Sequence, residues 1–482
     1  MSVEKYIVKS KLLIKKFIKE NNNINALNLI KSLAEIYYEY NQIYTDNELE
    51  EDLLLLKQRL LNLNRYTVNP NIVFFYDGFG LDFRGLAASY IKALTSLKYN
   101  VIYSCPSTSF GNIPNILSEL DPESSKIIYI DICDNEINKI KVIDSIFNRY
   151  RPKISFFYTT PNDVAGYIAF ANNPSSTRIL VDLTDHAFWL GVNILDYIFE
   201  SRNMGASIAV YQRGIESNKI IKIDCAPYLN HNISEKKLPF DIYKEKYIFT
   251  GGKLYKTLGD PEHLYYKTIS YLLEKYKNIK FLYVGDGDKK EINKLISKYL
   301  NRVYIVSERA DFFEIMKNCL IYINSYPMFG GLMMRYAALA GKVPITLKHE
   351  NDSDGILINQ DKLGIDFESY TLFIQEIELL LSDQTYRQKK EKLLRSSVYD
   401  DDLFRNELNK AIVNHKTSYI FENIQKFNTD KFRNEYKRRY SILMLYKSIA
   451  KKRNLDLIMF FPMAFVVTFF YKVKEKIRNG FF

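Results

Sequence analysis

The sequence is poor in residues that build disulfides and metal sites, with only four cysteines and five histidines among 482 residues. The cysteines form no CxxC pair, and three of them lie in or beside apolar runs, which is typical of buried, reduced thiols in a cytosolic protein. His231, His263, His349 and His415 lack the spacing of metal ligands. We therefore expect neither a disulfide framework nor a metal centre, and no cofactor.

Motifs of several common enzyme classes are also missing. The glycine pattern GxGxxG of dinucleotide-binding domains is absent, and so is the G-x-S-x-G turn of serine hydrolases. Two acidic stretches, "NDSDG" (Asp352 and Asp354) and "YDDDLF" (residues 400–402), resemble the Asp-x-Asp of metal-dependent transferases. Neither follows an expected strand end that faces a cleft, so solvated acids at turns and helix starts explain them better.

Long uncharged runs are rare, and the longest notable one lies near the C-terminus. The N-terminus carries charges throughout and lacks the apolar core of a secretory signal. Residues 457–471, "LIMFFPMAFVVTFFY", form an uncharged stretch of about 22 Å as a helix, shorter than the roughly 30 Å hydrocarbon core of a bilayer. We expect an interfacial or re-entrant segment; a helix docked on the protein and a true span are the alternatives.

The net positive charge of the chain is concentrated in the same region, and the rest of the chain is almost neutral. The chain has a net charge of +11, and residues 431–482 alone hold 13 Lys and Arg against three acids, a net charge of +10. A local basic patch beside an apolar stretch favours an anionic membrane surface as its partner, and it disfavours nucleic acid. We expect a cytoplasmic protein attached peripherally to the inner face of the plasma membrane.

The rest of the chain alternates between helix-like segments and short apolar runs. Residues 1–66 read as helices, and strands are expected at "NIVFFYDG", "NVIYSCP", "KIIYIDI", "KISFFYTT", "RILVDL" and "SIAVYQ". After a polar break the pattern restarts with "YIFTGG", "IKFLYVGDG", "RVYIVS", "CLIYINS" and "VPITL". Because the runs are almost continuously apolar, they predict parallel strands covered by helices on both faces. The fold class expected is α/β, with two doubly wound Rossmann-like domains. The expected units are an N-terminal helical segment (1–66), a first domain (67–235), a second domain (236–385), helices packing back between the domains (386–430) and a basic, apolar helical tail (431–482).

Polar residues follow several of these runs at the strand ends, where doubly wound sheets bind ligands. "VDLTDHAFWLG" places Asp185, His186 and Trp189 after one strand, and "YIFTGGKLYK" places Gly252, Lys253 and Lys256 after another. Glycines beside two cations suit a diphosphate, although a turn with solvated lysines is the simpler explanation. The loop "PMFGGLMM" opens a helix whose free backbone N–H groups suit a phosphate.

The second half resembles the donor domain of GT-B glycosyltransferases, and within them the family 4 group. The resemblance rests on "GGKL", "FLYVGDG", "RVYIVSERADFFEIMKNCLIYINS" and "GGLMMRYAALAGKVPIT" in this order, and it covers residues 246–385 well and 70–235 loosely. It implies a UDP- or GDP-sugar donor, catalytic roles for His186 and Asp185, and diphosphate binding by Lys253 and Lys256. The further residues expected around the ligands are Gly252, Gly330 and Gly331 (diphosphate), Ser307, Glu308, Arg309, Tyr326 and Tyr336 (nucleoside and sugar), and Arg84, Gly85 and Trp189 (acceptor side).

One departure from the family pattern affects the functional prediction. The family carries two glutamates in the "PMFGGLMMRYAALAG" region, and Met328 and Tyr336 stand at those positions. Tyr336 retains a hydroxyl that could donate a hydrogen bond to ribose. The expected function is transfer of a sugar to a growing, lipid-linked surface polysaccharide. The alternatives are a non-catalytic subunit of a glycan-assembly complex, a protein-glycosylating transferase and a nucleotide-sugar epimerase.

Overall fold

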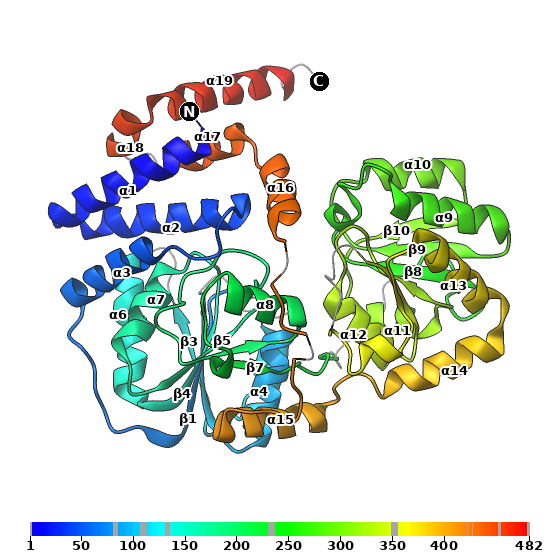
Figure 1. Ribbon diagram of the computed structural model, residues 1–482, viewed down its shortest axis with the longest axis horizontal. Coiled ribbons are helices and arrows are strands. Elements are labelled where there is room, and N and C mark those ends of the chain that lie inside the picture. The colour runs from blue at the N-terminus through cyan, green and yellow to red at the C-terminus, as the bar shows by residue number, and fades with distance from the viewer. Residues whose placement is uncertain are drawn as a thin grey trace.

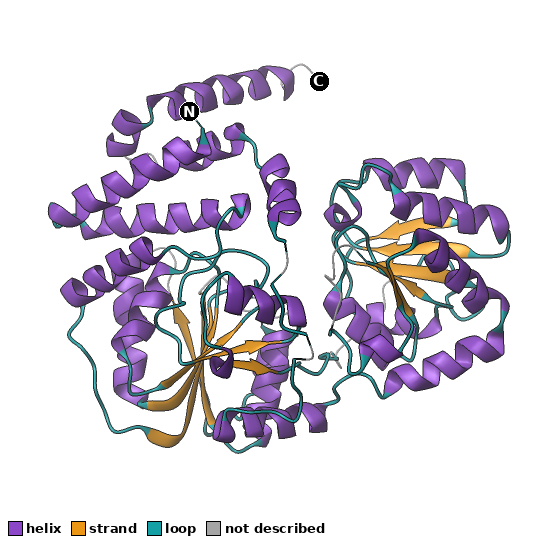
Figure 2. Cartoon of the chain, in the orientation of Figure 1, coloured by secondary structure: helices purple, strands orange, loops and turns teal. Residues whose placement is uncertain are grey.

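The protein has two α/β domains side by side and a layer of helices stacked on the first of them (Figure 1). Both sheets are parallel throughout, with helices on both faces (Figure 2), so the predicted fold class is confirmed. The computed structural model describes residues 2–80, 85–106, 113–130, 135–229, 237–348, 355–421, 423–426, 428–451 and 455–479.

The N-terminal domain is built on a seven-stranded sheet with the order β3-β2-β1-β4-β5-β6-β7. Its strands are β1 (Asn69–Asp77), β2 (Asn100–Pro106), β3 (Lys126–Ile130), β4 (Pro152–Tyr158), β5 (Thr177–Val181), β6 (Tyr197–Glu200) and β7 (Ile220–Lys222). Its helices are α4 (Leu86–Ser96), α5 (Pro114–Glu119), α6 (Glu136–Tyr150), α7 (Val164–Asn172), α8 (Asn203–Tyr211) and the short 3₁₀ turn η3 (Ser217–Lys219).

The apolar run of β1 shows why such strands are not amphipathic. Phe74 and Tyr76 belong to the core under α6 and α7, whereas Val73 and Phe75 belong to the core under α4. All four side chains are at most 1% exposed. Because successive side chains point to opposite faces and both faces are covered, both sets have to be apolar.

The C-terminal domain repeats this plan with six strands in the order β10-β9-β8-β11-β12-β13. The strands are β8 (Tyr247–Gly251), β9 (Lys280–Val284), β10 (Val303–Val306), β11 (Tyr322–Ile323), β12 (Pro344–Leu347) and β13 (Asp366–Phe367). The helices are η4 (Leu254–Thr257), α9 (Leu264–Lys275), α10 (Lys290–Lys298), α11 (Phe312–Asn318), α12 (Gly331–Leu339), η5 (Gln360–Lys362), α13 (Tyr370–Ser382) and α14 (Gln384–Arg395).

One predicted strand is wrong. "SIAVYQ", residues 207–212, lies in α8 and its C-terminal cap, and the strand of this region is β6, four residues long. A short buried helix and a buried strand are both continuously apolar, so periodicity cannot separate them.

A layer of helices from both ends of the chain covers one side of the N-terminal domain (Figure 1). The layer comprises α1 (Val3–Lys19), α2 (Asn23–Tyr40), α3 (Asn47–Leu60), α16 (Asp430–Arg439), α17 (Ile442–Lys451), α18 (Leu455–Phe460) and α19 (Pro462–Asn479). Helix α15 (Asp401–Asn414), which precedes α16 in the chain, is not part of this layer and packs against α4.

The C-terminal tail docks on the N-terminal helices through aromatic contacts. The ring of Phe461 lies 4.7 Å from that of Tyr6, and the ring of Tyr440 lies 5.7 Å from that of Tyr40. For residues 457–471 this is the docked helix, which the sequence offers as an alternative to an interfacial segment. Its other face leaves large apolar side chains exposed, namely Met459 (69%), Met463 (58%), Phe469 (65%) and Phe470 (65%).

No helix in the described part of the chain combines the length and the apolar character needed to cross a bilayer.

Candidate active site

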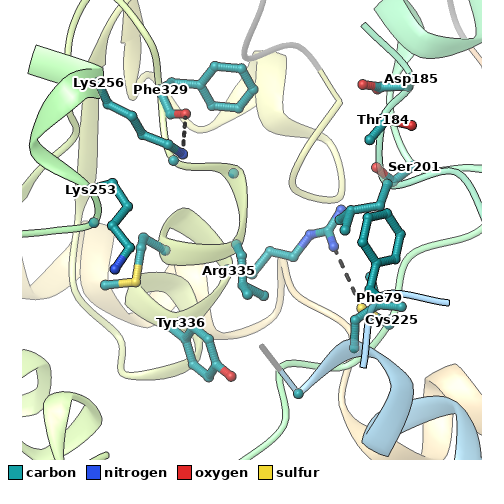
Figure 3. Close-up of a pocket in the computed structure, with 18 of the residues that line it drawn as sticks. Phe79, Thr184, Asp185, Ser201, Cys225, Lys253, Lys256, Phe329, Arg335 and Tyr336 are labelled. Carbon is teal, nitrogen blue, oxygen red and sulfur yellow. Dashed lines mark hydrogen bonds between the residues drawn. The ribbon is translucent and has the colours of Figure 1, made fainter. Parts of the chain in front are cut away.

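A cavity of about 1420 Å³ lies between the two domains, at the carboxyl ends of strands from both sheets. From the N-terminal domain it is lined by the loops after β5 and β6, and from the C-terminal domain by the loops after β8 and β9 and the start of α12. His186, Asp185, Lys253 and Lys256 all line it. Figure 3 shows the lysines and Asp185 on opposite walls. The predicted convergence of distant strand ends is therefore observed.

Asp185 is held beneath His186 by a buried arginine. Arg202 donates from Nε to Oδ2 at 2.5 Å and from Nη2 to Oδ1 at 2.7 Å. The nearby cation outweighs the effect of burial and lowers the pKa of Asp185, so this carboxylate is ionised. The Nδ1 atom of His186 lies 3.3 Å from Asp185 Oδ1, which orients the imidazole at the cavity wall.

Two further carboxyl groups lie behind Asp185. Asp182 follows β5 and lines the cavity, and Glu200 is buried at the end of β6. Burial raises the pKa of each carboxyl group, and the charge of Asp185 adds to this effect whereas that of Arg213 opposes it. Burial and mutual repulsion both favour the neutral form of these carboxyl groups, and the pKa of Glu200 is raised the most. Gly205 of α8 leaves room for this cluster, because a Cβ there would lie 2.7 Å from Asp185 Oδ2.

The opposite wall carries the two predicted lysines. Lys253 forms a half-exposed ion pair with Glu308, with 2.7 Å between Nζ and Oε2. The Nζ atom of Lys256 donates to the carbonyl of Phe329 at 3.2 Å, which fixes the lysine beside the α12 loop (Figure 3). Gly252 has a φ of +136°, and no atom lies within 4 Å of where its Cβ would be, so the backbone is open to a ligand there.

The start of α12 faces the same space. Gly330 caps this helix without any side-chain hydrogen bond to its first turn, and Gly331 begins it. Asn324 fixes the loop by accepting a hydrogen bond from Gly330 N–H at 2.8 Å. Both glycines line the cavity. The backbone N–H groups and the dipole of this nine-residue helix suit an anion.

The residues predicted to hold the nucleoside are only partly in the cavity. Glu308 and Arg309 line it, but Arg309 is buried and paired with Asp311, with Nη2 2.6 Å from Oδ2. Ser307 and Tyr326 lie outside the cavity lining among the described residues. Tyr326 packs against the apolar core of the C-terminal domain, and Ser307 is exposed.

Tyr336 and its neighbour Arg335 join the two domains. The Tyr336 hydroxyl donates to the carbonyl of Tyr228 at 2.7 Å, so its hydrogen is engaged there and does not point to a ribose. The guanidinium of Arg335 bonds the carboxylate of Asp224 and lies 3.9 Å from Cys225 Sγ. Both contacts run from α12 to the segment after β7, so they hold the cleft walls at a fixed separation.

The acceptor-side prediction is wrong in one position. Trp189 is 3% exposed and does not line the cavity; its ring lies 4.6 Å from the guanidinium of Arg213. Arg213 in turn donates from Nη2 to the carbonyls of Asp185 and Ala187, at 2.9 and 2.6 Å. Trp189 therefore supports the His186 loop from behind. Gly85 lines the cavity, and Arg84 falls outside the described residues.

The rival acidic sites gain no support from the structure. Asp400 caps α15 by accepting from Leu403 N–H at 2.8 Å, and Asp401 pairs with Lys92. Asp352 and Asp354 lie outside the described residues. Within the described ranges, no group of three His, Cys, Asp or Glu could hold a metal ion.

Sequence reasoning missed several residues of the cavity. Arg202 follows β6, and a strand assignment at "YIFE" would have pointed to it by the same strand-end argument. Arg335 lies inside a helix and carries no comparable signal. Four residues of the helical layer also line the cavity, from α2 and α16, and nothing in their sequence placed them there; they are Glu35, Tyr38, Glu39 and Tyr436.

No protein-family model and no curated protein matches the sequence. Many solved structures match in fold. A glycosyltransferase from Rickettsia africae is 15% identical with a TM-score of 0.53, over 72% of this chain and 99% of that one. An O-GlcNAc transferase mutant from Thermobaculum terrenum is 12% identical with a TM-score of 0.50, over 89% and 82%. A putative UDP-N-acetylglucosamine 2-epimerase from Listeria monocytogenes is 12% identical with a TM-score of 0.50, over 72% and 97%.

The structural similarity establishes the fold. At these low sequence identities, the narrower resemblance to family 4 stays a prediction. The two Rossmann-like domains, their parallel sheets and the cavity between them are the arrangement found in these glycosyltransferases, so the chain has the GT-B fold.

Proposed function

We propose that this protein is a glycosyltransferase that moves a sugar from a nucleoside diphosphate sugar, with UDP or GDP as the nucleotide, to a glycan acceptor. The observation that carries the proposal is the single cavity with cationic groups and a helix N-terminus on one wall and an imidazole–carboxylate pair on the other. A diphosphate binds to cationic groups and a helix N-terminus, and a reacting hydroxyl group benefits from an imidazole held by a carboxylate.

The C-terminal wall would bind and activate the donor. Lys256 and the N-terminus of α12 would hold the diphosphate, and Lys253 would join them by exchanging its exposed partner Glu308 for a phosphate oxygen. In the reaction, the acceptor hydroxyl oxygen bonds to the anomeric carbon, and the bond from that carbon to the diphosphate breaks with its electron pair leaving on the diphosphate. Cations beside that oxygen stabilise the charge that develops there.

The N-terminal wall would handle the sugar and the proton. Asp185, kept ionised by Arg202, holds the His186 imidazole in place, and His186 would bond a sugar hydroxyl or accept the proton that the acceptor loses. Asp185 contacts the imidazole rather than the reacting atoms, so we assign it a positioning role.

The acceptor and the location are further parts of the proposal. The tail adds exposed apolar side chains on α18 and α19 to a basic segment, a combination that suits an anionic membrane surface. We therefore propose a lipid-linked surface glycan as the acceptor, at the cytoplasmic face of the plasma membrane.

A non-catalytic subunit of a glycan-assembly complex is the second candidate. Met328 and Tyr336 occupy the positions of the family's glutamates, and both line the cavity. The thioether of Met328 and the hydroxyl of Tyr336 offer the donor sugar and ribose weaker contacts than two carboxylates would, and the hydroxyl already donates a hydrogen bond to Tyr228.

The test is nucleotide binding followed by product analysis. UDP or GDP should raise the melting temperature of the purified protein by mass action, and Lys256→Ala should weaken the affinity about tenfold to a hundredfold, since a charge-assisted hydrogen bond is lost. Lys277→Ala, an exposed lysine outside the cavity, serves as the matched control.

Product analysis then separates the alternatives. Slow release of free sugar from UDP- or GDP-sugars supports a transferase, and conversion into an epimeric nucleotide sugar supports an epimerase. Nucleotide binding without any turnover supports the non-catalytic subunit. If neither nucleotide binds, the proposal is wrong.

A further inference from the structure

Two helices outside the sheet domains form part of the cavity wall beside His186. Helix α2 contributes Glu35, Tyr38 and Glu39, and α16 contributes Tyr436. The His186 ring lies 6.4 Å from the ring of Tyr38 and 6.5 Å from that of Tyr436. In Figure 1, α16 runs down from the helical layer on the side of the N-terminal domain that faces the C-terminal domain. The donor chemistry proposed above uses none of these four residues.

Hydrogen bonds fix this wall to the His186 loop. Asn41, which caps α2, donates from Nδ2 to the carbonyl of His186 at 3.1 Å. Gln42 donates from Nε2 to the carbonyl of Arg433 in α16 at 2.9 Å, and Arg433 donates from Nη2 to Gln212 Oε1 at 2.9 Å. The two helices and the loop are therefore one connected unit, and the wall is a built feature of the cavity.

The charge of this wall is opposite to that of the donor end. Glu35 and Glu39 are one helical turn apart on α2, and neither forms an ion pair with any residue that the structure describes. Burial, and then the charge of Glu35, raise the pKa of Glu39. One end of the cavity thus offers lysines, and the other offers two carboxyl groups and two tyrosine rings.

We propose that α2 and α16 form an acceptor subsite for a neutral sugar. The proposal rests on the proposed function and names the chemical class of its acceptor. Ionised carboxylates only accept hydrogen bonds, and a pyranose offers several hydroxyl donors. The faces of Tyr38 and Tyr436 offer flat apolar surfaces to the ring carbons of the sugar. His186 lies within 6.5 Å of both tyrosine rings, next to where the acceptor hydroxyl has to react.

The same two carboxylates select against negative charge. A uronic acid or a phosphate-bearing group in this subsite would bring like charges together inside a partly enclosed cavity. The terminal acceptor residue is therefore an uncharged sugar, and any phosphate of the acceptor lies outside this subsite. The wall depends on α16, so the tail takes part in forming the acceptor site.

Saturation-transfer NMR on the full-length protein, alone and with UDP or with GDP, tests this subsite. The probes are the methyl glycosides of glucose, galactose, mannose and N-acetylglucosamine, compared with methyl glucuronide and methyl galacturonide. We expect at least one neutral glycoside to bind and the uronides to bind about tenfold more weakly than their neutral parents. Glu35→Gln with Glu39→Gln should bring this ratio close to one, and Tyr436→Ala should weaken neutral binding about tenfold.

Control variants lie outside the cavity. Glu51→Gln on α3 and Tyr211→Ala on α8 change exposed residues of the same types and should leave glycoside binding unchanged. Binding of none of the glycosides, or a uronide that binds the wild type as well as its neutral parent, overturns the proposal. A carboxylate double variant that keeps the wild-type ratio also overturns it. Absence of both UDP and GDP binding in the same samples contradicts the donor chemistry instead, so the two failures are distinguishable.

Discussion

The two ion pairs of the cavity should respond very differently when their cation is removed. Arg202 and Asp185 form a buried pair, in which each side chain is 9% exposed, and Lys253 and Glu308 form a pair in which each is 50% exposed. Breaking a buried pair leaves an uncompensated charge and costs about 3–5 kcal/mol, whereas an exposed pair contributes about 0.2–1 kcal/mol. Arg202→Met should therefore lower the free energy of unfolding by about 3–5 kcal/mol, and Lys253→Met by less than about 1 kcal/mol.

The protein carries its own probe for this measurement. Trp189 is the only tryptophan, and it is buried against Arg213, which holds the backbone of the His186 loop. Its fluorescence during urea unfolding reports the region around Asp185. The two variants are compared by midpoint and slope, so that a change in stability is separated from a change in the unfolded state.

A double variant makes the reasoning falsifiable even if Arg202→Met does not fold. Asp185→Asn in the Arg202→Met background removes the stranded charge, so the double variant should recover at least about half of the lost stability. An Arg202→Met protein as stable as Lys253→Met refutes the argument, and so does a double variant that is no more stable than the single one.

Three further predictions follow from the same cluster and from the domain contact. Burial raises the pKa of Glu200, so the folded protein keeps this proton to a higher pH than the unfolded chain does. This contribution is complete below the unfolded pKa and falls by about 1.4 kcal/mol per pH unit as pH rises toward the folded pKa, so Glu200→Gln should flatten the melting temperature against pH; an unchanged slope contradicts it. Gly205→Ala places a methyl group 2.7 Å from Asp185 Oδ2 and should reduce sugar transfer at least about tenfold, measured as product formed per minute; full activity would show that the cluster tolerates displacement. Arg335→Leu strands the buried Asp224 carboxylate between the domains, so the radius of gyration from small-angle scattering should increase; an unchanged radius shows that other contacts hold the cleft.

The fold was predictable because its signals are local. Continuous apolar runs identified the strands except β6, β7 and β13, and helical periodicity identified α2 and α3. The failure at residues 207–212 came from a stretch too short and too uniformly apolar for its period to be measured. The fifteen uncharged residues near the C-terminus had several solutions, and docking on α1 was decided by aromatic partners such as Tyr6, more than 400 positions away.

The site was predictable only where a residue directly follows a strand. Parallel strands bring their carboxyl ends to one edge of a sheet, and Lys253 and His186 line the cavity from such positions. Ser307 and Tyr326 also follow strands but do not line it, so a strand-end position makes a residue a candidate and does not place it in the site. The sequence by itself thus determined two parallel-sheet domains and the strand-end residues that face each other. The tertiary structure decided which side chains support these residues. Trp189 packs against Arg213, and Arg202 holds the carboxylate of Asp185. Helices α2 and α16 add their carboxyl groups and tyrosines to the cavity wall. Hydrogen bonds, ion pairs and ring contacts depend on distance in space, and for these residues the partner is set by packing between elements far apart in the chain.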